Sequence, residues 1–154
     1  MGLDGSKGTQ VMRADLNKTN QELFDLMVAH LRTQGTTAIL DCISAYHGED
    51  GRRCPVGAII PDDLYSERME GKDITQLAKA SWVDPELNMM FRWHHTLLKA
   101  MQLVHDTMLP EVWERQFQFI AAKYNLLLDG KQVCIPTENN PLITRGSLGY
   151  APAV

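Results

Sequence analysis

The sequence predicts a mainly α, single compact domain of about five helices, with a small β-hairpin late in the chain. Three observations support this prediction. Apolar residues recur every three or four positions in several long stretches. Residues that cap helices stand where these stretches begin. The chain has 154 residues, of which 44% are hydrophobic and 22% charged, which is the composition of one globular domain.

The first predicted helix follows residues 1–18, whose Gly-, Lys- and Asp-rich composition indicates a flexible N-terminal arm. Thr19 and Glu22 form a capping-box pattern at the start of this helix. Gly35 is a typical residue at a helix end. The apolar stripe between these ends contains Leu23, Met27 and Leu31.

The central region is less regular. Residues 36–44 are short and apolar, and their pattern fits either a helix or a buried strand. Residues 46–51 contain turn-forming residues, and Pro55 can occupy the first position of a short helix after Cys54. Asp73 can cap a further helix.

The strongest helical pattern begins at Asp84-Pro85, a cap followed by a first-turn proline. Leu109-Pro110 begins another helix. We expect the core to form around nine residues from these helices and the first one. They are Leu23, Met27, Leu31, Trp93, Leu97, Met101, Trp113, Phe117 and Ile120. The Cys54 segment should lie against this core.

The end of the chain contains the hairpin signal Asp129-Gly130, which predicts pairing between residues 126–128 and 132–135. Residues 136–154 have the Pro-, Asn- and Gly-rich composition of a tail. The predicted organisation is therefore an arm over 1–18, a helical domain over 19–135 and a tail over 136–154.

The net charge and the cysteine content argue against several classes of function. The net charge of -4 argues against a general nucleic-acid-binding protein, which would carry a basic face. Three widely spaced cysteines, without a secretory signal or a long apolar stretch, indicate free thiols in the cytoplasm and no membrane association. Cys-x-x-Cys and His-x-x-x-His pairs are absent, so we expect no metal, and no motif implies another cofactor.

Residues 46–71 form the most distinctive segment, YHGEDGRRCPVGAIIPDDLYSERMEG. It resembles a loosely defined family of small proteins from tailed phages and bacteria. These proteins share Tyr-x-Gly, Asp-Gly, Cys-x-x-Gly, Ile-Pro-Asp, Tyr and Met-Glu-Gly in this order, and the likeness extends over about residues 19–128. Ser44 and His47 depart from the Cys and Arg that this family often carries. The resemblance implies a phage or prophage origin and no particular activity.

One candidate chemistry is a thiol enzyme with Cys54 as the nucleophile. A cysteine directly before a helix lies at its positive end, where the pKa of the thiol is lowered. Arg52 and Arg53 would lower it further. His47 or the pair His105 and Asp106 could serve as the base. The alternative is that Cys54 is a small buried core residue, and the histidines have only structural roles.

A second candidate is a site for a phosphate-containing small ligand on the loop from Arg52 to Gly57. The candidate ligand-binding residues are Tyr46, His47, Arg52, Arg53, Cys54 and Tyr65. The methionines and tryptophans of the later helices fit either a partner-binding groove or the core, and their helical spacing favours the core.

The sequence contains no complete catalytic constellation. We therefore expect a non-enzymatic, phage-type accessory protein that binds a host or viral protein or forms a homo-oligomer. The thiol enzyme and the phosphate binder are the alternatives.

Overall fold

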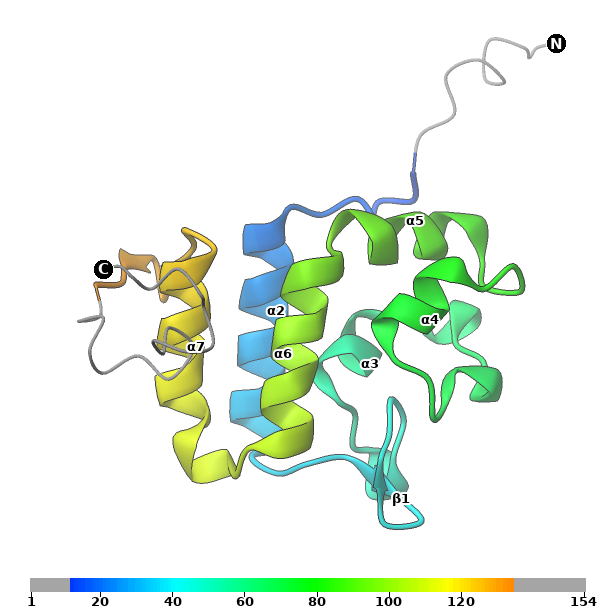
Figure 1. The fold of residues 1–154 in the computed structure, drawn as a ribbon, viewed down its shortest axis with the longest axis horizontal. Coiled ribbons are helices and arrows are strands. Elements are labelled where there is room, and N and C mark those ends of the chain that lie inside the picture. Colours follow the sequence, from blue (N-terminus) through cyan, green and yellow to red (C-terminus); the bar gives the residue numbers. More distant parts are fainter. Residues whose placement is uncertain (1–11, 135–154) are drawn as a thin grey trace, which may run out of the picture.

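The computed structural model describes residues 12–134, which form six α-helices and two short antiparallel strand pairs (Figure 1). The helices are α2 (Asn20–Gln34), α3 (Pro55–Ile59), α4 (Ile74–Lys79), α5 (Pro85–Trp93), α6 (His95–Thr107) and α7 (Trp113–Lys123). The strand pairs are β1 (Ile39–Leu40) with β2 (Ile43–Ser44), and β3 (Leu127–Leu128) with β4 (Lys131–Gln132). The predicted mainly α fold with a late hairpin is confirmed.

Helix α2 begins and ends as its sequence predicts. The Thr19 hydroxyl accepts a hydrogen bond from the Glu22 N–H at 3.1 Å, and the Glu22 carboxylate accepts one from the Thr19 N–H at 2.8 Å. Gly35 ends the helix in the left-handed conformation, with φ 71°. The predicted stripe is fully buried. It consists of Leu23, Met27 and Leu31.

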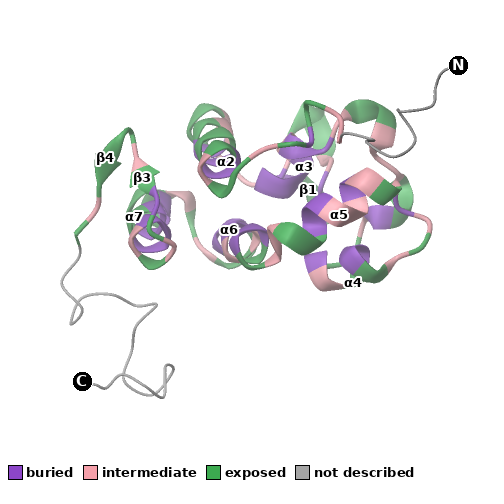
Figure 2. Ribbon diagram, turned by 90° about the horizontal axis from the view of Figure 1, so that it is seen from above, coloured by how far each residue is buried: buried purple, intermediate pink, exposed green. Residues whose placement is uncertain are grey.

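Helix α6 lies at the centre of the molecule, in contact with every other α-helix of the described region. Figure 2 shows α2, α6 and α7 nearly end-on, with their buried faces turned toward one another, while α3, α4 and α5 cover the other side of α6. Helices α6 and α7 form an antiparallel pair joined by a short loop (Figure 1). The core includes the buried α6 residues Leu97, Leu98, Met101 and Val104.

The long helical pattern after Asp84 is divided at His94 into α5 and α6. His94 has φ -112° and ψ 21°, which is not helical, and its Nδ1 lies 2.6 Å from the Asn20 side-chain oxygen. The break rotates the end of α5 relative to α6. Trp93 is therefore 63% exposed, and its predicted place in the core is wrong. The other eight predicted core residues are buried.

Residues 36–44 form neither a helix nor a buried strand. They form the β1–β2 hairpin, in which Ile39 pairs with Ser44 and Leu40 with Ile43. Asp41 and Cys42 make the turn with φ 51° and 65°. The strand residues are largely exposed, and Ile43 reaches 65%. Hydrophobicity predicted burial here, but the strands are only two residues long and lie at the periphery.

The late hairpin turns at Asp129 and Gly130, both with positive φ, as the sequence predicts. Its pairs are Leu127 with Gln132 and Leu128 with Lys131. Residue 135 of the predicted second strand, the tail over 136–154 and residues 1–11 of the arm lie outside the described residues.

The last part of the predicted arm belongs to the folded domain. Leu16 is 1% exposed and packs in the core, which the arm's composition did not suggest. The Arg13 guanidinium donates to Asp63 at 2.8 Å. Residues 12–18 are thus held by both apolar and ionic contacts, and the prediction that they are a flexible arm is wrong.

Candidate functional site

Glu70 organises the distinctive loop of residues 46–71. Its carboxylate accepts hydrogen bonds from the N–H groups of Tyr46 and His47 at 2.9 and 3.0 Å. It also accepts one from the Tyr65 hydroxyl at 2.6 Å. The rings of His47 and Tyr65 stack with centroids 3.7 Å apart. Tyr46 is buried, and its hydroxyl donates to the Lys72 carbonyl at 2.5 Å. Tyr46, His47 and Tyr65, three of the candidate ligand-binding residues, are thus joined through Glu70.

Cys54 caps α3 from a fully buried position. Its Sγ accepts a hydrogen bond from the Gly57 N–H at 3.2 Å. Burial raises the pKa of the thiol to about 12, because it outweighs the opposing effect of the hydrogen bond from the Gly57 N–H. The prediction of a lowered pKa is therefore wrong: the helix start is present, but water is excluded and the thiolate is unfavourable.

His105 and Asp106 have structural roles in the described region. His105 is 1% exposed, and its Nε2 accepts a hydrogen bond from the Ala38 N–H at 2.9 Å. Its Nδ1 therefore carries the proton and donates to Asp106 at 2.8 Å. Both ring nitrogens are thus occupied. Within residues 12–134, no hydrogen bond joins Cys54 to either candidate base, so the structure does not assemble the proposed nucleophile–base pair.

The two loop arginines do not form a joint anion site. Arg53 makes an ion pair with Asp62 at 2.9 Å, which neutralises its charge. Its backbone is held by Gln34, whose side chain accepts from the Arg53 N–H and donates to the Arg53 carbonyl. Arg52 is exposed on the loop. The following helix has five residues, and its Gly57 N–H is already used by the Cys54 sulfur.

Two glycines of this segment are required by close backbone contacts. A Cβ atom at Gly57 would lie 2.0 Å from the Tyr46 carbonyl oxygen, and one at Gly48 would lie 2.6 Å from the Ile39 backbone nitrogen. No side chain fits at such distances. The pattern that stands out in the sequence thus describes how the loop packs, and it does not describe an assembled catalytic site.

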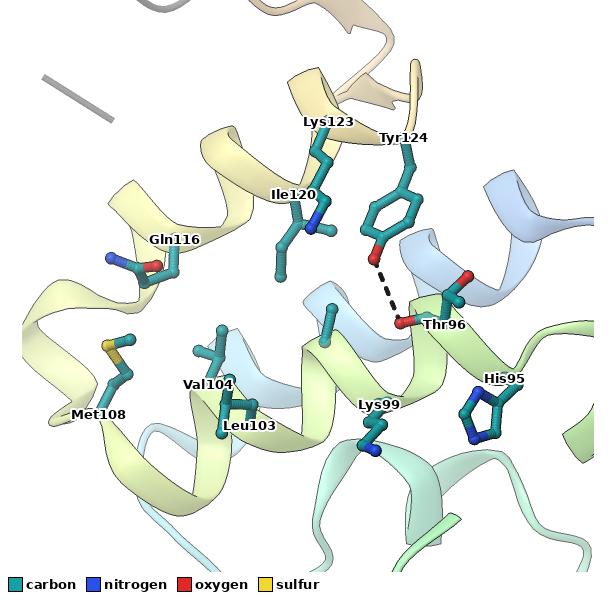
Figure 3. Close-up of a pocket in the computed structure, with 11 residues that line it drawn as sticks. His95, Thr96, Lys99, Leu103, Val104, Met108, Gln116, Ile120, Lys123 and Tyr124 are labelled. Atoms are coloured by element: carbon teal, nitrogen blue, oxygen red, sulfur yellow. Dashed lines mark hydrogen bonds between the residues drawn. The ribbon is translucent and has the colours of Figure 1, made fainter. Parts of the chain in front are cut away.

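The described residues form a groove of about 430 Å³ between α6 and α7, on the side away from α2 (Figure 3). Its lining is largely apolar, and Leu103 on α6 is 53% exposed. The lining residues are His95, Thr96, Lys99, Ala100, Leu103, Val104, Met108, Gln116, Ile120, Lys123 and Tyr124.

The two ends of this α6/α7 groove differ. At one end the Tyr124 hydroxyl donates to the Thr96 carbonyl at 3.4 Å, which joins the two helices. At the other end lie Met108 and Gln116 (Figure 3). The Gln116 side-chain oxygen is buried and has no hydrogen-bond partner within the described region.

The sequence patterns did not predict this groove. The methionines and tryptophans of the sequence fit a partner-binding groove or the core, and Met90, Met101 and Trp113 are buried in the core. Of that set, Met108 lines the groove. The available signal was Leu103, an apolar residue outside the main stripe of its helix.

Two further observations concern metal ligands and membrane-spanning helices in the described region. Residues 12–134 contain no group of three or more His, Cys, Asp or Glu side chains that could hold a metal ion. No helix among them has both the length and the apolar character needed to cross a membrane.

Comparisons with protein-family models, with curated proteins and with solved structures found no match to this chain.

Proposed function

We propose that this chain is a non-enzymatic accessory protein that binds a host or viral protein through the α6/α7 groove. The observation that carries the proposal is the groove itself, a largely apolar channel with the half-exposed Leu103 on its α6 wall. Apolar channels between paired helices are a common way to bind a segment of a partner protein. The phage or prophage origin and the cytoplasm of a bacterial host as its location rest on the resemblance and the free thiols.

The energetics favour an occupied groove. Covering an exposed Leu removes its apolar surface from water, which stabilises a complex by about 25 cal/mol for each Å² buried. The neighbouring Ala100 and Ile120 extend the apolar surface on both helices. A partner segment that covers all of them gains from several residues at once.

The alternative functions have less support. A thiol enzyme needs a reactive thiolate, whereas Cys54 is buried with a raised pKa. A phosphate binder on the same loop needs free cationic groups, whereas Arg53 is paired with Asp62. The groove provides a surface that no contact within residues 12–134 fills.

The test is native mass measurement of the purified protein, alone and after incubation with a bacterial lysate. We expect a defined complex that Leu103→Asp abolishes, because a carboxylate placed in the groove would lose its hydration on binding. Leu26→Asp is the matched control, since Leu26 is 46% exposed on α2. Circular dichroism checks that both variants fold. A complex that survives Leu103→Asp, or no complex at all, would refute the proposal.

A further inference from the structure

We infer that the natural occupant of the α6/α7 groove is an amphipathic partner helix of about three turns, with acidic side chains beside its apolar stripe. This inference rests on the proposed function, because it names the chemistry of the segment that the groove binds. It is carried by the length of the groove, by its largely apolar lining and by the charges on its rim.

The length of the groove matches a short helix. Its α6 side runs from Thr96 to Met108, the residue directly after the helix, a separation of about 18 Å at 1.5 Å per residue. This corresponds to about twelve helical residues, or three turns. Helices α6 and α7 form the two walls with α2 behind them (Figure 3), so an occupant would pack against both helices from the open side.

The largely apolar lining matches one face of such a helix. Leu103 projects from the α6 wall and Ile120 from the α7 wall. A helix with apolar residues at positions i, i+4, i+7 and i+11 presents a continuous stripe to both walls. Met108 lies at one end, where its unbranched side chain can adjust to the occupant.

The charges at the rim of the groove determine which charge the side chains of a partner should carry. Lys99 on α6 and Lys123 on α7 line the groove, and among residues 12–134 no acidic side chain does so, although the whole chain carries a net charge of -4. Both lysines are exposed. Figure 3 shows the Lys123 amine turned toward the space between the helices.

Both amines can pair with partner carboxylates. The Lys99 amine makes one long hydrogen bond of 3.5 Å to the Thr75 hydroxyl, which a carboxylate can readily replace. A basic helix would instead meet like charges on both rims. The groove therefore favours acidic partner residues over basic ones.

The experiment compares two fluorescent stapled peptides of about fifteen residues, long enough for four helical turns. Both carry the same stripe of leucines. One has glutamates beside the stripe and the other has lysines at the same positions. Fluorescence anisotropy measures binding to the full chain. We expect the glutamate peptide to bind roughly tenfold more tightly than the lysine peptide, and added salt to reduce the difference.

Three variants connect this preference to the groove. The double variant Lys99→Glu, Lys123→Glu should reverse it, and Leu103→Asp should weaken both peptides. A matched double variant, Lys79→Glu with Arg92→Glu, changes exposed basic residues of α4 and α5 and should leave the preference unchanged.

The outcomes separate the two proposals. If Leu103→Asp abolishes the lysate complex but the peptides bind equally or not at all, the acidic-helix inference fails and the proposed function stands. If no complex forms and neither peptide binds, both fail. A homodimer that Leu103→Asp dissociates would identify a second copy as the occupant. The glutamate peptide could also bind only after Leu142→Asp and Ile143→Asp are introduced together. That result would identify the C-terminal segment of the chain itself as the occupant of the groove. Both of these results would overturn the inference.

Discussion

At the scale of single residues, burial decides which side chains can react. Cys54 follows two arginines and begins a helix, and both features usually favour a thiolate. Its surroundings are the hydrophobic core, where the charged form loses its hydration. His105 is similarly buried, with its ring nitrogens bonded to Ala38 and Asp106. These residues thus hold α3, α6 and the segment before β1 in place.

Alkylation tests this assignment directly. With iodoacetamide at neutral pH, we expect Cys42 and Cys134 to react and Cys54 to remain unmodified, because Cys54 is buried and its pKa is raised to about 12. Cys54 should react once urea unfolds the protein. Mass spectrometry of the digested protein measures the three sites separately. Rapid modification of Cys54 in the folded protein would instead support the thiol-enzyme alternative.

The contact between Gly57 and Tyr46 gives a second prediction. Gly57→Ala should destabilise the protein by about 3 kcal/mol or more, because the new Cβ would lie 2.0 Å from a backbone oxygen that cannot move without disturbing the core. Urea unfolding measures the change. The neighbouring substitution Ala58→Gly, at a half-buried position of the same helix, is the control and should cost about 1 kcal/mol. Equal losses would show that the contact relaxes.

At the scale of elements, the sequence predicts those features that local chemistry determines. The caps of α2, α4 and α5 are formed by Thr19, Asp73 and Asp84 as expected, because each side chain bonds to N–H groups within three residues. The break at His94 is different. It is accompanied by a contact with Asn20, 74 positions away, which no local pattern contains.

In the candidate site, too, the sequence predicts local features but not the contacts between distant residues. The sequence identifies the unusual segment of residues 46–71 but not its role, since Glu70 acts through contacts with residues 23 and 24 positions away. The groove depends on how α6 and α7 pair, and on which of their apolar residues no other helix covers. Leu103 has the same hydrophobicity as the buried Leu97 and differs from it in the sequence only by its position outside the main stripe, which does not show whether another helix covers it.

The first cap allows a quantitative test. Thr19→Ala should lower the free energy of unfolding by about 1 kcal/mol, because the Glu22 N–H loses its side-chain acceptor. Thr33→Ala is the same chemical change at an exposed position inside α2. It should be neutral or slightly stabilising, because Ala has the higher helix propensity. Chemical denaturation compares the two variants, and equal effects would exclude a capping contribution.

At the scale of the whole molecule, ion pairs join segments that are distant in sequence. Arg32 on α2 contacts both Glu114 on α7 and Asp129 in the β3–β4 turn, each at 2.7 Å. Arg13 connects the N-terminal residues to Asp63 in the same manner. The two pairs of Arg32 join α7 and the late hairpin to α2.

These pairs predict that the protein loses stability in acid. The hydrogen bond from Arg32 lowers the pKa of Asp129 below its ordinary range, and the one from Arg13 does the same for Asp63. A carboxyl with a lowered native pKa stabilises the fold above its unfolded pKa, and this contribution disappears as pH falls through the native value. The urea midpoint should therefore decrease below about pH 4. Arg32→Met should flatten this decrease, whereas Arg92→Met, at an exposed site on α5, should not. Equal pH dependence in both variants would mean that the Arg32 pairs do not distinguish the folded from the unfolded state.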